Sequence, residues 1–239
     1  MSADESRVPE RRAAMWEGSK QDSSKWVQKR RLADAMRLVI ERLVPSNAPE
    51  DELRRAADAL ERYAGQLASH PRLRYVHGFS ESANAGDVGA FFDQSPMIGL
   101  ANPLAPPIRL SQTGPRTAQG LVTFGSAYEG PPGSVHGGFV AAAFDEVLGY
   151  VQSLGERPGM TGTLTVRYRT PTPLHTELRF EAELVGMEGR KIFTKGQVLG
   201  GGRVCAEAEG IFISVPPERF AALEALRAER ERERSSEGD

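Results

Sequence analysis

The sequence contains a single cysteine and no long hydrophobic run. With Cys205 as the only thiol among 239 residues, the chain cannot form an internal disulfide, which is typical of proteins from reducing compartments. No apolar segment approaches the roughly 18 residues that a membrane-spanning helix needs, and the polar residues 1–12 lack the apolar core of a secretion signal. We therefore expect a cytoplasmic protein without a membrane span.

The chain also has no marked excess of positive or of negative charge. The chain has 30 Lys and Arg against 32 Asp and Glu, a net charge of −2, so nothing indicates a nucleic acid or an anionic membrane as partner. No Gly-x-Ser-x-Gly sequence occurs, which makes a serine hydrolase of that type unlikely on sequence grounds. The four histidines are scattered without ligand spacing, so we expect no metal and no other cofactor.

The most informative segment runs from Gly133 to Gly149. It begins with glycines typical of a turn and continues as an almost unbroken apolar run that contains Asp145. A helix that is apolar on every side must be buried, and a carboxylate in such a helix loses several kcal/mol of hydration unless a partner compensates. Asp145 is therefore a candidate catalytic group, with a purely structural, paired acid as the alternative.

The spacing within this segment indicates a dimer. A helix that starts near Gly137 presents unpaired backbone N–H groups that suit a developing oxyanion. Asp145 lies eight residues later, about 12 Å along the helix axis. One substrate carbonyl cannot contact both groups of a single chain, whereas two antiparallel helices across a twofold axis would bring them together.

Two further sequence motifs flank this segment, at residues 128–133 before it and at residues 160–174 after it. The second contains a Tyr-x-x-Pro sequence that begins at Tyr168. Together with His136-Gly137-Gly138 and an Asp nine residues after the His, they resemble the hot-dog-fold acyl-CoA thioesterases, in particular the PaaI-like branch. The resemblance covers about residues 106–215. It implies an α+β hot-dog fold, in which an antiparallel β-sheet wraps around a long central helix.

The resemblance also implies an activity, the hydrolysis of an acyl-CoA or acyl-carrier thioester. Asp145 is then the nucleophile or the general base, and the backbone N–H of Gly137 is the oxyanion donor. Thr161 is expected beside the acid, where it orients water or the carboxylate, although a threonine at a strand start is the alternative. His136 either contacts the thioester or fixes the geometry of the loop.

The candidates for substrate binding are less specific. Arginine and lysine side chains suit the phosphates of CoA, but solvated surface charges explain them as well. Many relatives carry an Asn six residues before the His, where this chain has Gly130, so its hydrogen bond must come from elsewhere or be absent. The candidates are Gly138, Asn102, Phe139, Arg167, Arg169, Arg190 and Lys191.

Two other functions are compatible with a hot-dog domain. One is a non-catalytic acyl-CoA binder or sensor, and the other is a dehydratase, whose local arrangement of Asp and His we do not find. Retention of Asp145 beside Thr161 favours the enzyme. An apolar lining of Phe139, Phe144, Met97 and Leu100 suggests a medium, long or aromatic acyl group. We expect an acyl-CoA partner and a homodimer or a dimer of dimers.

The remaining chain divides by pattern. Residues 1–22 are predicted to be disordered, 23–70 to form a helical hairpin, 71–105 a loop-rich connection, 106–216 the hot-dog domain and 217–239 a charged helix and tail. Helices are predicted at 24–43 and 50–69, with apolar residues on one face of each. We expect the hairpin to pack on the sheet or to extend the dimer interface.

Alternation of apolar and polar residues predicts strands at 121–124, 163–168 and 178–184, and glycines predict hairpin turns at 188–190 and 200–203. Short strands are expected at 73–76 and 88–92, and a helix at 220–234. The apolar loop 95–104 forms either a wall of the substrate pocket or part of the core.

Overall fold

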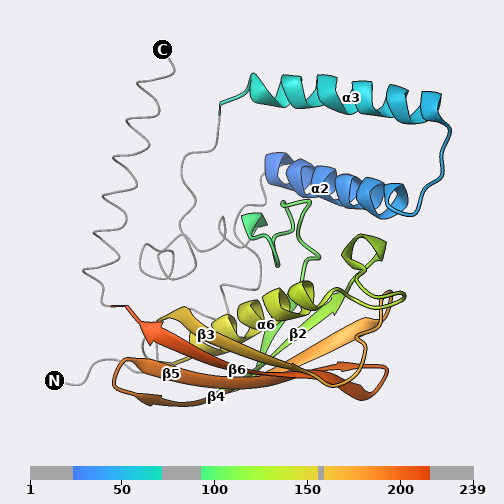
Figure 1. Cartoon of the computed structure of the whole chain (residues 1–239). Helices are drawn as coiled ribbons and strands as arrows, with labels where there is room; N and C mark the ends of the chain where they lie inside the picture. Colours follow the sequence, from blue (N-terminus) through green and yellow to red (C-terminus); the bar gives the residue numbers. More distant parts are fainter. Residues whose placement is uncertain (1–23, 72–92, 156–158, 216–239) are drawn as a thin grey trace.

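The computed structural model describes residues 24–71, 93–155 and 159–215 (Figure 1). Its strands are β1 (Arg109–Gly114), β2 (Thr117–Thr123), β3 (Gly159–Tyr168), β4 (Glu177–Glu188), β5 (Lys191–Gly200) and β6 (Arg203–Ser214), and its helices are α2 (Ser24–Leu43), α3 (Glu50–Ala68), the 3-10 turn η1 (Ser126–Tyr128) and α6 (Gly137–Gln152). The strands form one antiparallel sheet in the order β1-β2-β4-β5-β6-β3, and α6 lies across one face of it (Figure 1). This arrangement confirms the predicted α+β hot-dog fold and its N-terminal helical hairpin.

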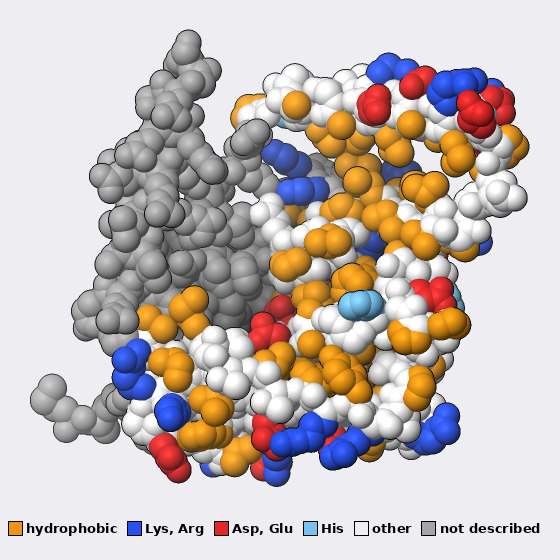
Figure 2. Space-filling view, in the orientation of Figure 1, with side chains coloured by type: hydrophobic (Ala, Val, Ile, Leu, Met, Phe, Trp, Pro, Cys, Tyr) orange, Lys and Arg blue, Asp and Glu red, His pale blue; other side chains and the backbone are white. Residues whose placement is uncertain are grey.

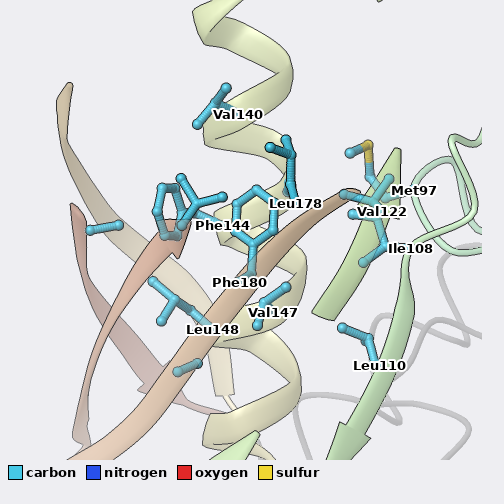
Figure 3. Packing of buried hydrophobic residues seen from close by; sticks show 14 of the residues in the cluster. Met97, Ile108, Leu110, Val122, Val140, Phe144, Val147, Leu148, Leu178 and Phe180 are labelled. Carbon is cyan, nitrogen blue, oxygen red and sulfur yellow. The ribbon is translucent and has the colours of Figure 1, made fainter. Parts of the chain in front are cut away.

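The core lies between α6 and the sheet. Phe144 of α6 packs edge to face against Phe180 of β4, with ring centroids 5.0 Å apart, and both side chains are fully buried. Val140, Val147 and Leu148 extend the same face of the helix into the core (Figure 3). These apolar residues return every three or four positions, which places them on one side of the helix.

The two predicted hairpin turns are confirmed. Gly189 lies in the turn between β4 and β5 with a φ of 58°, and Gly201 and Gly202 lie in the turn between β5 and β6 with φ of 57° and 79°. A residue with a side chain rarely adopts these backbone angles. β1 was not predicted, because only Leu110 of its residues is buried and the alternation is too weak to show in the sequence.

A β-bulge at Gly162 sets which side chains of β3 face the helix. Thr161 pairs with Phe212 of β6, and Thr163 pairs with Ile211, the neighbour of Phe212. Gly162 therefore has no partner of its own. Without the bulge, Thr161 would point to the same face as Thr163, away from α6. The extra residue therefore turns Thr161 toward the central helix.

Helix α2 is attached to the domain through charged side chains. Arg30 holds Asp93 through two bonds of 3.0 and 2.6 Å. Arg37 donates to the backbone oxygens of Leu100 and Asn102. One turn later, Glu41 accepts hydrogen bonds from the backbone N–H of Ser126, at 2.8 Å, and from its hydroxyl, at 3.0 Å.

The hairpin therefore does not pack on the sheet, which corrects one of the two predicted positions. The groups to which α2 forms hydrogen bonds are backbone groups, the carboxylate of Asp93 and the hydroxyl of Ser126, which need charged or polar partners, and Ala33 is the one buried residue among those described in the helix. The apolar residues of α2 remain largely exposed, and α3 has no buried residue at all.

Several expectations fall outside the described residues, namely those for 1–22, 73–76, 88–92 and 220–234. In the loop 95–104, Met97 and Ile98 are buried in the core, whereas Leu100 and Leu104 are exposed. Core packing is thus the role of Met97. No helix among the described ranges has the length and hydrophobicity needed to cross a membrane.

Glu146 is a second acid on α6, next to Asp145. Its side chain is half-buried, and within the described residues its carboxyl group has no hydrogen bond or ion pair. Burial, with a smaller contribution from the negative charge of Asp145, raises the pKa of Glu146 from 4.5 to about 7. The folded protein thus keeps this carboxyl protonated at a pH at which the unfolded chain ionises it.

The consequence is a loss of stability with rising pH. Between about pH 4.5 and about pH 7 the unfolded state ionises Glu146 while the folded state does not, so unfolding becomes easier, and above about pH 7 the loss is complete. We predict that Glu146→Gln removes this loss, which amounts to about 3 kcal/mol in the free energy of unfolding. Urea unfolding of both proteins at pH 5, 6, 7 and 8 measures it, with the exposed Glu188→Gln as control. A difference between mutant and wild type that does not change with pH would contradict it.

Candidate active site

Asp145 and Thr161 are brought into direct contact. The Thr161 hydroxyl donates a hydrogen bond of 2.7 Å to Oδ1 of Asp145, from the inner face of β3 to the side of α6. No described residue donates a hydrogen bond to Oδ2, which leaves this oxygen available for a water or a substrate. The contact fixes the orientation of the carboxylate.

The N-terminus of α6 keeps one backbone donor free. His136 caps the helix, because its Nδ1 accepts the N–H of Gly138 at 3.0 Å. Its carbonyl accepts the N–H of Phe139 at 2.9 Å. Among the described residues nothing accepts the N–H of Gly137. The capping contact assigns Gly138 and His136 to loop geometry and leaves Gly137 as the candidate oxyanion donor.

Tyr168 is a residue of this site that the sequence analysis did not assign. Its hydroxyl donates a hydrogen bond of 2.7 Å to the carbonyl of Gly137. A Cβ at Gly137 would lie 3.2 Å from that hydroxyl oxygen, so the glycine allows the ring to approach closely. The Tyr-x-x-Pro sequence was noted only as a family feature, and no spacing rule links a strand residue to a helix start 31 residues earlier.

The turn before α6 explains the glycine at position 130. The backbone N–H of Gly130 donates to the carbonyl of Ser134 at 2.9 Å, and His136 donates its N–H to Tyr128 at 2.8 Å. A Cβ at position 130 would lie 2.7 Å from the Cα of His136. No other residue fits there without moving the start of α6, so this turn excludes the asparagine of many relatives.

Asn102 does not replace that asparagine. Its side-chain amide donates to the carbonyl of Gln94 at 3.0 Å, and its Oδ1 accepts the N–H of Leu104 at 3.0 Å. The side chain thus holds its own loop together. Phe139, two residues after Gly137 in α6, packs edge to face on Tyr128, with ring centroids 4.8 Å apart.

The candidate arginines are divided between two places. Arg167 and Arg169 form ion pairs with Glu209 and Glu207 of β6, at 2.8 and 2.6 Å, on the face of the sheet away from α6. The neighbouring Glu209 raises the pKa of Arg167, which favours its charged form. These two residues are not brought together with Asp145.

Arg190 and Lys191 lie at the turn from β4 to β5. The Nε of Arg190 donates to the carbonyl of Ser214 at 3.2 Å, and Lys191 is exposed opposite Ile213 of β6. That end of the sheet also carries the start of β3. The two side chains are therefore better placed than Arg167 and Arg169 to meet a phosphate near Thr161.

The described residues of a single chain do not enclose the site. A hollow of about 800 Å³ lies on the outer face of the sheet and one of about 300 Å³ lies beside α2, and Asp145 lines neither. The side of α6 that faces away from the sheet, with Asp145, Glu146 and Gly149, is half-buried. Within the described ranges no three His, Cys, Asp or Glu side chains gather as metal ligands do.

Comparison with known proteins agrees with this fold. The family model described as the thioesterase superfamily matches residues 132–206. The acyl-coenzyme A thioesterase THEM4 of Xenopus laevis is 35% identical over 95 residues, which are 39% of this chain and 43% of that protein. The Mus musculus protein of the same name is 33% identical over 93 residues, 38% of this chain and 40% of that protein. The chain thus spans less than half the length of these curated relatives.

A solved structure extends the similarity over most of the chain. A crystal structure of a thioesterase superfamily protein matches with a TM-score of 0.70 and 35% identity, and the match covers 82% of this chain and 97% of the other. Residues 72–239 are 168 of the 239 residues, or about 70%, so the similarity must include part of the first 71 residues. On this evidence, the chain belongs to the thioesterase superfamily.

Proposed function

We propose that this protein hydrolyses an acyl-CoA or acyl-carrier thioester to the free acid and the thiol. The observation that carries the proposal is the hydrogen bond of 2.7 Å from Thr161 to Asp145, on a helix whose first N–H, that of Gly137, has no acceptor among the described residues. The printed names of the relatives, acyl-coenzyme A thioesterases, support the same substrate class. Assignment to the PaaI-like branch stays a prediction.

In the general-base route, Asp145 takes a proton from a water whose oxygen attacks the thioester carbonyl carbon. The carbonyl oxygen becomes an oxyanion, which the N–H of Gly137 stabilises. The tetrahedral intermediate then breaks its carbon–sulfur bond, and the thiolate takes the proton back from Asp145. In the nucleophilic route Asp145 attacks the carbonyl directly, and the carbon–sulfur bond breaks to release the thiolate. Water then hydrolyses the resulting anhydride to the free acid and the Asp145 carboxylate, and the proton it releases goes to the thiolate. Both routes need Asp145 ionised at the start.

The proposed site is shared between two subunits. Gly137 and Asp145 of one chain are separated by about 12 Å along the helix, so the donor must come from the second chain. β3 is ten residues long, lies at one edge of the sheet and pairs only with β6 among the described strands. Such an open edge, together with the half-buried side of α6, supports a partner of the same kind at this end of the sheet.

The proposal assigns binding roles near this site. Arg190 and Lys191 would contact the CoA phosphates, and Phe139 would contact the acyl group. A sensor that only binds acyl-CoA is the alternative, but it has no use for an oriented carboxylate beside the thioester. No step of the proposed reaction requires a cofactor.

We predict that Asp145→Asn and Asp145→Ala each lower kcat by at least about 10²-fold, since neither variant can accept the proton or attack. The measurement is thiol release from a panel of acyl-CoA substrates. Asp58→Asn, which removes an exposed carboxylate on α3, is the control and is expected to leave kcat unchanged. Rates within a few-fold of wild type for both Asp145 variants would remove this residue from the mechanism.

A substitution at Gly137 can test the backbone donor alone. Proline lacks the N–H and is tolerated at the first position of a helix, and His136, with φ −59° and ψ 131°, has the conformation that a following proline favours. We predict that Gly137→Pro lowers kcat by about 10²–10³-fold. Gly137→Ala keeps the N–H but places the same Cβ against Tyr168, and we expect a loss below about tenfold. Equal losses in the two variants would mean that the N–H is not the donor.

The shared site can be tested with mixed dimers. We combine an Asp145→Ala subunit and a Gly137→Pro subunit under two affinity tags and purify the heterodimer. One of its two sites then has both wild-type groups, and we expect about half of the wild-type activity per dimer, although each parent homodimer is inactive. Thiol release by the doubly purified species measures this. A heterodimer as inactive as its parents would show that both groups act within one chain.

A further inference from the structure

Helix α3 is fully formed but has no close packing partner among the described residues. None of its 19 residues is buried, and it is not packed closely against α2 or the sheet. Most of the stability of helices in proteins comes from packing one apolar face against the rest of the structure. The described part of a single chain therefore supplies no packing partner for α3.

The apolar residues of α3 follow a heptad pattern. They are spaced alternately three and four residues apart, which places them in one stripe along the helix: Leu53, Ala56, Leu60, Tyr63 and Leu67. Most positions beside the stripe are occupied by alanine, at Ala57, Ala59 and Ala64, which widens the apolar face, and the one charge beside it is Glu52 in the first turn. Such a broad face is typical of a helix in a bundle.

Helix α2 carries a second stripe with the same spacing, at Leu32, Met36, Val39 and Leu43. Because α2 is attached to the domain through Arg30, Arg37 and Glu41, this stripe is left at the surface. Figure 2 shows hydrophobic side chains along the lower side of α3 and over α2, at the upper right of the view.

The exposed apolar area of the two stripes is comparable to that of a protein–protein interface. The seven large residues Met36, Val39, Leu43, Leu53, Leu60, Tyr63 and Leu67 are each between 38% and 53% exposed. Large apolar side chains of this size present on the order of 500 Å² together at that exposure. A standard interface buries roughly 800 Å² per partner, of which about 60% is apolar. The two stripes thus supply the apolar surface that one partner of a stable interface needs.

We propose that this surface, the α2–α3 seam, docks against the same seam of a second copy of the chain, so that two hairpins form an intermolecular four-helix bundle. In a twofold-symmetric dimer the same surface of each copy contacts its counterpart on the other copy. Each stripe then packs against a stripe of the same spacing. A different protein as partner is less favoured, because the charges beside the two stripes are only Arg42 and Glu52, which are of opposite sign and offer no net charge by which one could be selected. The proposal does not depend on the proposed hydrolysis.

The test is the mass of the full-length protein by sedimentation equilibrium over a range of concentrations. Leu60→Glu places a charge in the middle of the α3 stripe, and we expect the dissociation constant of the association step to rise at least about 100-fold. Leu60→Ala keeps the helix and removes only packing, and we expect a rise of at least about tenfold. Thermal unfolding of the domain, followed by near-UV circular dichroism, checks that both variants remain folded.

Gly65→Glu is the matched control, because it adds the same charge to α3 on the side away from the stripe, where a Cβ would meet nothing within 4 Å. We expect its dissociation constant to stay within about threefold of the wild type. A wild-type protein that is monomeric, or Leu60 variants that associate like Gly65→Glu, would overturn the proposal. The second result would mean that the stripe closes within one chain or binds another protein.

Discussion

The structure depends on a helix that its own sheet can cover only on one side. Val140, Phe144, Val147 and Leu148 of α6 fill the concave face of the sheet, and their burial places the helix across it. Asp145 and its neighbours on the opposite side are apolar or acidic and only half-buried. This partial cover explains both why an acid can lie on an otherwise apolar helix and why the described part of one chain leaves the site open.

Much of the site was readable from the sequence because its signals are short-range. The glycine-rich turn, the start of α6 and the acid nine residues after His136 lie on one continuous segment, where helix geometry fixes distances. The contact between Asp145 and Thr161 followed from the family resemblance rather than from physics. It depends on the bulge at Gly162, and an alternating strand pattern does not reveal an extra residue.

Other features were not readable because they depend on the opposing surface. The pattern of α2 correctly predicted a helix but indicated the wrong docking face, since the loop beneath it offers carbonyl groups and Asp93 to Arg30 and Arg37. Tyr168 could not be assigned either, because its role comes from contact with a glycine far away in the sequence. The reason for Gly130 became visible only when the backbone of His136 was seen to pass within the reach of a Cβ.

Strand β3 carries a contact to the acid at one end and a contact to the helix start at the other, through Thr161 and Tyr168. In the proposed dimer these two contacts belong to different catalytic centres, so each copy of the strand serves both. A single insertion or deletion between them during evolution would turn one contact outward while leaving the other in place. Residues between Thr161 and Tyr168 can therefore be substituted more readily than they can be inserted or deleted. The number of residues between the two positions keeps both side chains on the face of the sheet that contacts α6.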